Sequence, residues 1–237
     1  MPWQLLLSPS DYVLQLCALL RDPIYRGIRV PAGRGEPVLL IPGFLAGDWT
    51  LFIMAGWLTR MGYRPYFSGI NWNVDCPNKT GELLRWRLDH ITRETSGPII
   101  VIGHSLGGML GRFLGANFPE KICHVIALGA PVDNSMRVHP LVLSASQLLQ
   151  PLRRIRGQSS LACGSPRCAC RFSQTVFASL PEGVGFTSIF SKGDEVVDWR
   201  SCIDPQGENR QVSGRHAGLV VNREVYRLLA DVLASHQ

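Results

Sequence analysis

Two runs of almost unbroken apolar residues constrain the fold of this chain more than any other feature. They are Pro37–Pro42 and Pro98–Gly103, each bounded by proline or glycine. A strand with this composition is buried on both faces, which is typical of a parallel sheet that helices cover on each side. Cys123–Gly129 and Gly185–Phe190 repeat the pattern, and Gly62–Phe67 is a weaker example.

Amphipathic segments separate these runs along the chain. The spacing of apolar residues predicts helices over Ser10–Leu20, Thr50–Met61, Thr80–Thr95, Leu106–Asn117 and Asn222–Ala234. Strands that alternate with helices are typical of the α/β class. We therefore expect an open, mostly parallel sheet with helices on both faces.

The length of 237 residues suits one domain, because a single hydrophobic core can grow to roughly 250–300 residues. We expect residues 1–237 to form that domain, with a small cap inserted at about 134–180. In the insertion the strand–helix alternation stops, and apolar residues recur at roughly helical spacing: Leu141, Val142, Leu148, Leu149 and Leu152. Hydrophobic residues make up 46% of the chain, which excludes a disordered protein.

Charge and terminal sequence limit the partners of this chain. The net charge of +6 comes from scattered basic residues, apart from a cluster at Arg153–Arg156, so we expect no nucleic-acid partner.

No apolar run approaches the roughly 18–20 residues of a membrane span, so we expect no transmembrane segment. The first residues lack the pattern of a signal peptide, which favours a cytoplasmic location. The arginine cluster beside the apolar cap leaves room for transient contact with a lipid surface.

Seven cysteines are present, three of them in a cluster. Cys163, Cys168 and Cys170 follow a C-x4-C-x-C spacing, and Cys202 comes later. Zinc sites usually carry paired C-x2-C spacings with supporting histidines, which this segment lacks. We expect ordinary thiols or one or two disulfides, and neither a metal nor another cofactor.

Gly103–Gly107 reads Gly-His-Ser-Leu-Gly, which matches the pattern G-x-S-x-G. The motif directly follows one of the buried strands and opens the predicted helix Leu106–Asn117. Such a setting is that of a nucleophile elbow, in which a serine occupies a sharp, strained turn. Ser105 is therefore the candidate nucleophile, and a serine in an ordinary glycine-rich turn is the alternative.

A serine hydroxyl needs a base to take its proton and a third group to orient that base. In hydrolases with this elbow, the acid and then the histidine follow the serine along the chain. His216 precedes the last helix and is the candidate base, whereas His236 is the penultimate residue. Asp194, at the turn after the preceding strand, is the favoured acid, and Asp198 and Glu195 stay open.

Two backbone amides must stabilise the oxyanion that forms during acyl transfer. One belongs to Leu106, the residue after the candidate nucleophile. The other is expected after an early strand, where Pro42-Gly43-Phe44-Leu45 offers the amide of Phe44. A plain glycine turn is the alternative interpretation of this loop.

Together these motifs resemble the α/β-hydrolases of the bacterial lipase and esterase type. The similarity rests on Gly-His-Ser-Leu-Gly-Gly, Ser-Lys-Gly-Asp-Glu-Val-Val and Gly-Arg-His-Ala-Gly, and covers most of the chain from about Val38. Many such lipases have histidine before the oxyanion glycine, where this chain has Pro42. The resemblance implies no cofactor, and it implies that Ala127–Asp133 borders an acyl pocket. Candidate pocket residues, two of them in the cap, are Leu45, Pro131, Val132, Leu148 and Leu149.

The leading interpretation is a serine hydrolase that cleaves carboxylic esters with lipid-like or other apolar acyl groups. It would use a Ser105–His216–Asp194 triad and an acyl-enzyme intermediate, with a small-molecule or lipid ester as its partner. The Gly-His-Ser-Leu-Gly-Gly motif also occurs in thioesterases and acyltransferases, which stay open as alternatives. A binding module with an unused triad is the alternative from a different class. The sequence does not determine the natural substrate, the acyl length or the oligomeric state.

Overall fold

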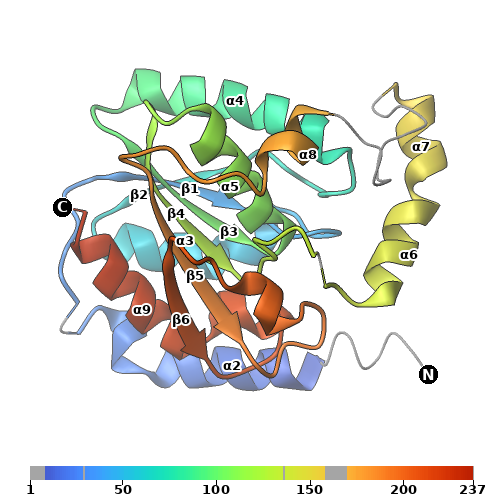
Figure 1. Ribbon diagram of the computed structural model, residues 1–237. Helices are drawn as coiled ribbons and strands as arrows, with labels where there is room; N and C mark the ends of the chain where they lie inside the picture. The colour runs from blue at the N-terminus through green and yellow to red at the C-terminus, as the bar shows by residue number, and fades with distance from the viewer. Residues whose placement is uncertain (1–8, 29, 136, 158–169, 237) are drawn as a thin grey trace.

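The computed structural model describes residues 9–28, 30–135, 137–157 and 170–236. Within these residues, one six-stranded sheet has the order β2-β1-β3-β4-β5-β6, and every neighbouring pair is parallel (Figure 1). The open parallel sheet predicted from the apolar runs is therefore confirmed. The strands are β1 (Pro37–Ile41), β2 (Arg64–Phe67), β3 (Ile99–His104), β4 (Ile122–Leu128), β5 (Gly185–Ser191) and β6 (Glu208–Val212).

Consecutive residues of the central strands serve opposite faces of the sheet. In β1, Val38 and Leu40 join the core on one face, whereas Leu39 and Ile41 join the core on the other. All four side chains are fully buried. Because neither face meets water, the strand is apolar throughout instead of alternating between apolar and polar residues.

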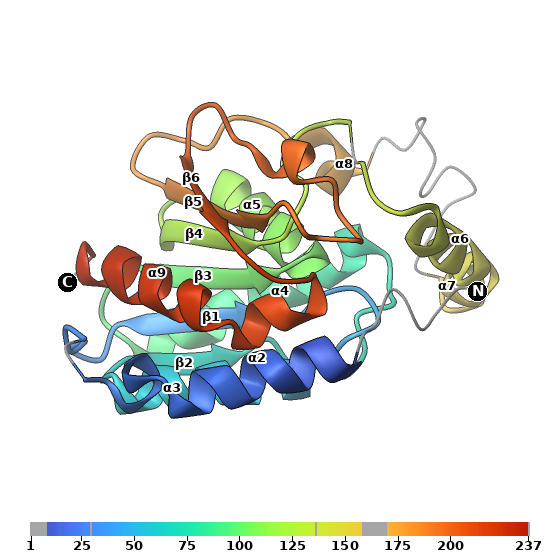
Figure 2. The same ribbon diagram turned by 90° about the horizontal axis from the view of Figure 1, so that it is seen from below.

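Helices cover both faces of the sheet (Figures 1 and 2). One layer holds α2 (Pro9–Arg21), α3 (Phe52–Arg60) and α9 (Arg223–Ala234), and the other holds α4 (Pro77–Glu94), α5 (Leu106–Asn117) and α8 (Arg171–Thr175). Four 3-10 helices in the described segments are η1 (Pro23–Arg26), η2 (Asp48–Leu51), η3 (Trp199–Cys202) and η4 (Ala217–Val221). Each predicted helix is present, although the one expected over Thr50–Met61 begins as η2. None of the described helices is both long and apolar enough to cross a membrane.

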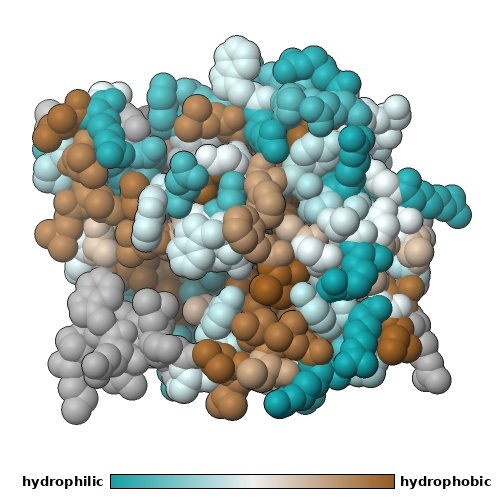
Figure 3. Space-filling view, turned by 180° about the vertical axis from the view of Figure 1, so that it is seen from behind, coloured by the Kyte–Doolittle hydropathy of each residue, from teal (hydrophilic) through white to brown (hydrophobic). Residues whose placement is uncertain are grey.

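Two helices stand at one side of the molecule, apart from both layers (Figure 2). They are α6 (Pro140–Leu148) and α7 (Gln150–Ile155), which come after β4 and before β5 in the chain. Buried Arg153 ties α7 to the loop after β2, because its Nε donates to the Val74 carbonyl oxygen at 2.7 Å. In the view from behind, apolar surface gathers on this side (Figure 3). The exposed apolar side chains of the two helices are Leu143, Leu148, Leu152 and Ile155.

The edge strand β6 has no counterpart among the predicted strands. Its sequence is Glu-Asn-Arg-Gln-Val, and the first four residues are exposed. It pairs with β5 from Thr187 to Ser191. An edge strand that faces solvent carries no apolar run, so the pattern that revealed the central strands is missing here.

The start of α5 lies very close to the ends of the strands. An added Cβ atom on Gly107 would overlap the carbonyl oxygen of Ile41 in β1. An added Cβ atom on Gly103, at the end of β3, would overlap the backbone of Gly107. The two glycines therefore allow the chain to pass from β3 into α5 within a single residue, Ser105.

Gly107→Ala should lower the free energy of unfolding by at least about 2 kcal/mol, because the β1 backbone cannot move away from the added methyl group. Gly56→Ala is the matched control, since Gly56 lies in α3 and an added Cβ would meet no atom within 4 Å. This control should raise stability by about 0.5–1 kcal/mol, because alanine is the better helix former. Urea denaturation of the three proteins measures both effects. Equal stabilities of the two variants would contradict the close approach of α5.

Candidate active site

Ser105 occupies the sharp turn between β3 and α5. Its φ of 52° and ψ of −121° lie in a region that residues other than glycine rarely adopt. The Ser105 amide donates to the Leu128 carbonyl oxygen at 2.8 Å, which attaches the turn to the end of β4. A strained serine at a strand–helix junction is the geometry of a nucleophile elbow.

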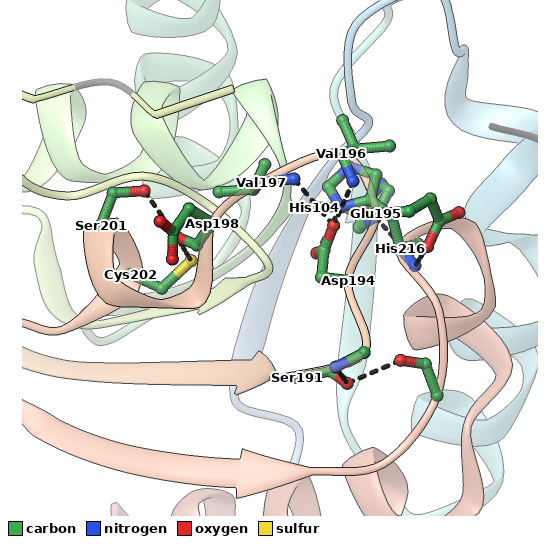
Figure 4. Close-up of polar contacts among 12 residues, drawn as sticks. His104, Ser191, Asp194, Glu195, Val196, Val197, Asp198, Ser201, Cys202 and His216 are labelled. Atoms are coloured by element: carbon green, nitrogen blue, oxygen red, sulfur yellow. Dashed lines mark hydrogen bonds and ion pairs between the residues drawn. The ribbon is translucent and has the colours of Figure 1, made fainter. Parts of the chain in front are cut away.

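Asp194 and His216 form a buried hydrogen-bonded pair. His216 Nδ1 lies 2.7 Å from Asp194 Oδ2, and only 9% of the His216 side chain and 2% of the Asp194 side chain are exposed. Asp194 Oδ1 accepts from the backbone amides of Val196 and Val197, each at 2.8 Å (Figure 4). A carboxylate can only accept a hydrogen bond, so His216 Nδ1 is the donor. In the neutral form of the imidazole the proton is therefore on Nδ1, and Nε2 has a free lone pair.

The chain just after β4, β5 and β6 surrounds this pair. Gly129, after β4, has a φ of 56°, and an added Cβ would lie 3.1 Å from Asp194 Oδ2 and 3.3 Å from His216 Nδ1. Glycine is therefore the residue that fits this position without strain or crowding. At the end of β5, Ser191 Oγ donates to the Gly214 carbonyl oxygen at 2.6 Å. This bond joins the turn that carries Asp194 to the loop that carries His216.

The other two carboxylates considered from the sequence bind elsewhere. Asp198 caps η3 by accepting from the Arg200 amide at 3.0 Å. That bond, aided by the charges of Arg200 and Arg137, holds the pKa of Asp198 below its usual value. Glu195 accepts from the backbone amide of His216 at 3.3 Å. Of the three candidates, the carboxylate that reaches the imidazole is therefore that of Asp194.

Ser105 is linked to the pair through His104, the residue that precedes it in the chain. In the described part of the chain, Ser105 Oγ makes no hydrogen bond to His216. Its neighbour His104 does reach His216, with ring centroids 4.7 Å apart. The loop after β1 is also close to this serine, because an added Cβ on Gly43 would lie 3.2 Å from Ser105 Cβ. These groups lie at the carboxyl ends of the strands, where open α/β sheets bind their ligands. A missing bond between Ser105 and His216 fits such a site, because catalytic hydrogen bonds often form only when substrate is bound.

Two backbone amides near Ser105 have no acceptor among the described residues. They belong to Phe44, in the loop after β1, and Leu106, the first residue of α5. Amides in the first turn of a helix have no intrahelical partner, and the positive end of the helix dipole lies at the same place. Both amides were predicted as oxyanion donors, and their unpaired N–H groups suit that role.

Asn73, which is not among the predicted site residues, holds the loop that carries Phe44. Its Nδ2 donates to the Pro42 carbonyl oxygen at 2.8 Å, and its backbone amide donates to the Ala46 carbonyl oxygen at 2.7 Å. Its own carbonyl accepts from the Leu45 amide at 3.1 Å, and only 1% of the residue is exposed. Pro42 lies 31 residues earlier in the chain. No local sequence motif could therefore have revealed this contact.

No family model and no curated protein matches this sequence. Solved structures match its fold. A lipase from Bacillus licheniformis in its mature form has a TM-score of 0.63 and 15% identity, over 86% of this chain and 94% of that chain. An α/β-hydrolase enzyme from a sediment metagenome of the Mar Chica lagoon, Morocco, has a TM-score of 0.60 and 15% identity, over 86% and 93%. The chain has the α/β-hydrolase fold. A thioesterase domain from the curacin biosynthetic pathway shares the fold, with a TM-score of 0.52 and 16% identity, over 86% and 93%.

Within this α/β-hydrolase fold, the five residues predicted to line an acyl pocket lie in different environments. Leu45 is exposed on the loop after β1 and has a φ of 60°. Pro131 and Val132 are buried after the end of β4. On α6, Leu148 is 80% exposed, and Leu149 at its end is half-buried. The acyl pocket stays a prediction.

The cysteine cluster lies mostly outside the described residues, since Cys163 and Cys168 are not among them. Among the described residues, no group of three or more His, Cys, Asp and Glu side chains could hold a metal ion. Cys202 is buried in a small apolar cluster with Phe190 and Val197, and burial raises the pKa of its thiol. A thiol in such surroundings is inert at neutral pH, which leaves Ser105 as the better nucleophile of the two.

Asp194→Asn should slow the labelling of Ser105 by an organophosphonate probe about 10⁴-fold, because the amide favours the wrong imidazole tautomer. Asp198→Asn is the matched control and should slow labelling only a few fold, since its carboxylate caps η3 instead of contacting His216. Intact mass measured over time gives both labelling rates. The opposite order of effects would make Asp198 the acid.

Proposed function

We propose that this chain is a serine hydrolase that cleaves carboxylic esters with apolar acyl groups. The observation that carries the proposal is the buried Asp194–His216 hydrogen bond of 2.7 Å, at the strand edge where Ser105 occupies its strained turn. Acyl transfer of this kind needs a nucleophile, a base and an acid that orients the base. The three residues also follow one another along the chain in the order usual for this fold.

In the proposed reaction, the Ser105 hydroxyl attacks the ester carbonyl carbon while His216 Nε2 takes its proton. Asp194 stabilises the resulting imidazolium, and the Phe44 and Leu106 amides donate to the oxyanion. The imidazolium then gives its proton to the leaving alcohol as the C–O bond breaks, and Ser105 is left acylated. Water, which loses a proton to His216, attacks the acyl group. The carboxylic acid leaves as His216 returns that proton to Ser105 Oγ, which regenerates the enzyme.

The surface next to the loop after β1 suits an apolar acyl group. Trp49 and Trp72 are exposed there, with ring centroids 6.4 Å apart. Leu45 is exposed on the loop itself. Exposed apolar side chains that gather in this way mark binding surfaces for ligands. In the proposal, the acyl chain of a small-molecule or lipid ester lies against these three side chains and the leucines of α6.

A thioester is the second candidate substrate. The same nucleophile, base and oxyanion amides can act on a thioester carbonyl, and the fold is shared with a thioesterase domain. Comparison of kcat/KM for an oxygen ester and a thioester of the same acyl group distinguishes the two candidates. Acyl transfer requires an alcohol or amine acceptor that competes with water, and acceptor-dependent product would reveal it.

Ser105→Ala should reduce the hydrolysis of p-nitrophenyl esters about 10⁴–10⁶-fold, because the acyl-enzyme can no longer form. The release of p-nitrophenol measures the rate, and the thermal unfolding midpoint shows whether the variant is folded. Ser144→Ala, at an exposed serine on α6, is the matched control and should keep wild-type activity. Near-wild-type turnover by folded Ser105→Ala protein would end the serine-hydrolase proposal.

The double change Leu148→Ser and Leu149→Ser should reduce kcat/KM for a decanoyl ester about tenfold more than for an acetyl ester, because roughly 0.8 kcal/mol is lost for each methylene that leaves apolar contact. Ile155→Ser on α7, as exposed as Leu148, is the matched control and should affect neither ester. Equal losses on both esters would mean that α6 supports the fold generally and does not contact the acyl chain.

A further inference from the structure

His104 lies in direct contact with the candidate base, although it belongs to none of the three catalytic positions. It is the last residue of β3 and precedes Ser105. Its ring centroid lies 4.7 Å from that of His216, and the two rings are tilted by 43°. Its Nε2 lies 3.0 Å from the backbone carbonyl oxygen of His216 (Figure 4). One side chain therefore touches both the ring and the main chain of the base.

The chemistry of this contact defines the protonation state of His104. A carbonyl oxygen can only accept a hydrogen bond, so His104 Nε2 must carry the proton. Burial, and next the nearby His216, lower the pKa of His104 to about 3. The ring is therefore neutral across the working range of pH. A neutral ring neither repels the imidazolium that forms on His216 nor competes with it for Asp194.

The far side of the His104 ring meets the loop that supplies the Phe44 amide. An added Cβ on Gly43 would lie 3.0 Å from His104 Nδ1. His104 thus stands between the loop after β1 and the loop that carries His216, next to the nucleophile. The titratable groups that face it from these packed elements are His216 and Asp194.

We propose that His104 is a positioning residue that sets the place of the His216 imidazole relative to Ser105. The His104 Nε2–H donates to the His216 carbonyl oxygen, and the His104 ring packs against the His216 imidazole and limits its tilt. The inference rests on the proposed function and adds a fourth side chain to it. A displacement of about 1 Å at a reacting group can cost about 100-fold in rate, so a hold of this kind has a measurable effect.

Two substitutions separate the hydrogen bond from the bulk of the side chain. His104→Leu fills similar space and removes the donor, whereas His104→Gln keeps an N–H donor near the position of Nε2. We expect the leucine variant to lose about 10- to 100-fold in kcat with little change in KM, because a misplaced base affects the chemical step. The acid limb of its pH–rate profile should move to lower pH, because a His216 imidazolium that is held less firmly is less well stabilised by Asp194. The glutamine variant should recover most of both losses.

A readout that needs no turnover keeps this inference separate from the proposed function. The NMR titration of the His216 imidazole should shift its midpoint in His104→Leu and return towards wild type in His104→Gln, whether or not the protein cleaves any ester. Absence of ester hydrolysis by the wild type would overturn the proposed function alone. Wild-type kcat, pH profile and His216 titration in folded His104→Leu would overturn the role of His104. Equal losses in the leucine and glutamine variants, with equally lowered melting temperatures, would also overturn it, because the donor would then be irrelevant.

Discussion

The close approach of α5 to the ends of β1 and β3 determines where the rest of the candidate site lies. Glycine at positions 103 and 107 leaves no side chain between the helix and the strands, so the backbone can turn within Ser105 alone. The positive φ of this serine is costly by itself, and such strain persists only where the surrounding packing enforces it. The same turn makes Leu106 the first residue of α5, with an amide that finds no acceptor in the described chain.

The remaining parts of the site arrive on separate loops, and side-chain bonds to backbone atoms hold those loops together. Asn73 holds the loop of Phe44 through the Pro42 carbonyl oxygen, and His104 contacts the carbonyl oxygen of His216. The buried carboxylate of Asp194 is satisfied by two amides as well as by the imidazole. A buried charge is tolerated only with partners of this kind. The partners also orient the carboxylate towards the ring.

The four central strands and the turn at Ser105 were predictable because each has a local signature. A strand buried on both faces is apolar throughout, and a nucleophile elbow needs small residues around its serine. β6 is exposed and has no such signature, while the roles of Asn73 and His104 depend on partners 31 and 112 residues away. The choice between Asp194 and Asp198 depends on how the turn after β5 folds. The amides of Val196 and Val197 donate to Asp194. The amide of Arg200 donates to Asp198 instead. The acyl pocket depends on how α6 meets a ligand, which no spacing of leucines encodes.

The proposed reaction passes through a covalent intermediate on one serine, and a rapid acid quench tests this most directly. The wild-type protein is mixed with p-nitrophenyl butyrate, quenched within the first turnover, digested and analysed by mass spectrometry. The predicted result is a burst of p-nitrophenol together with one butyryl group on the peptide that contains Ser105. Release of p-nitrophenol without an acylated peptide, or acylation at a residue other than Ser105, would contradict the proposed reaction.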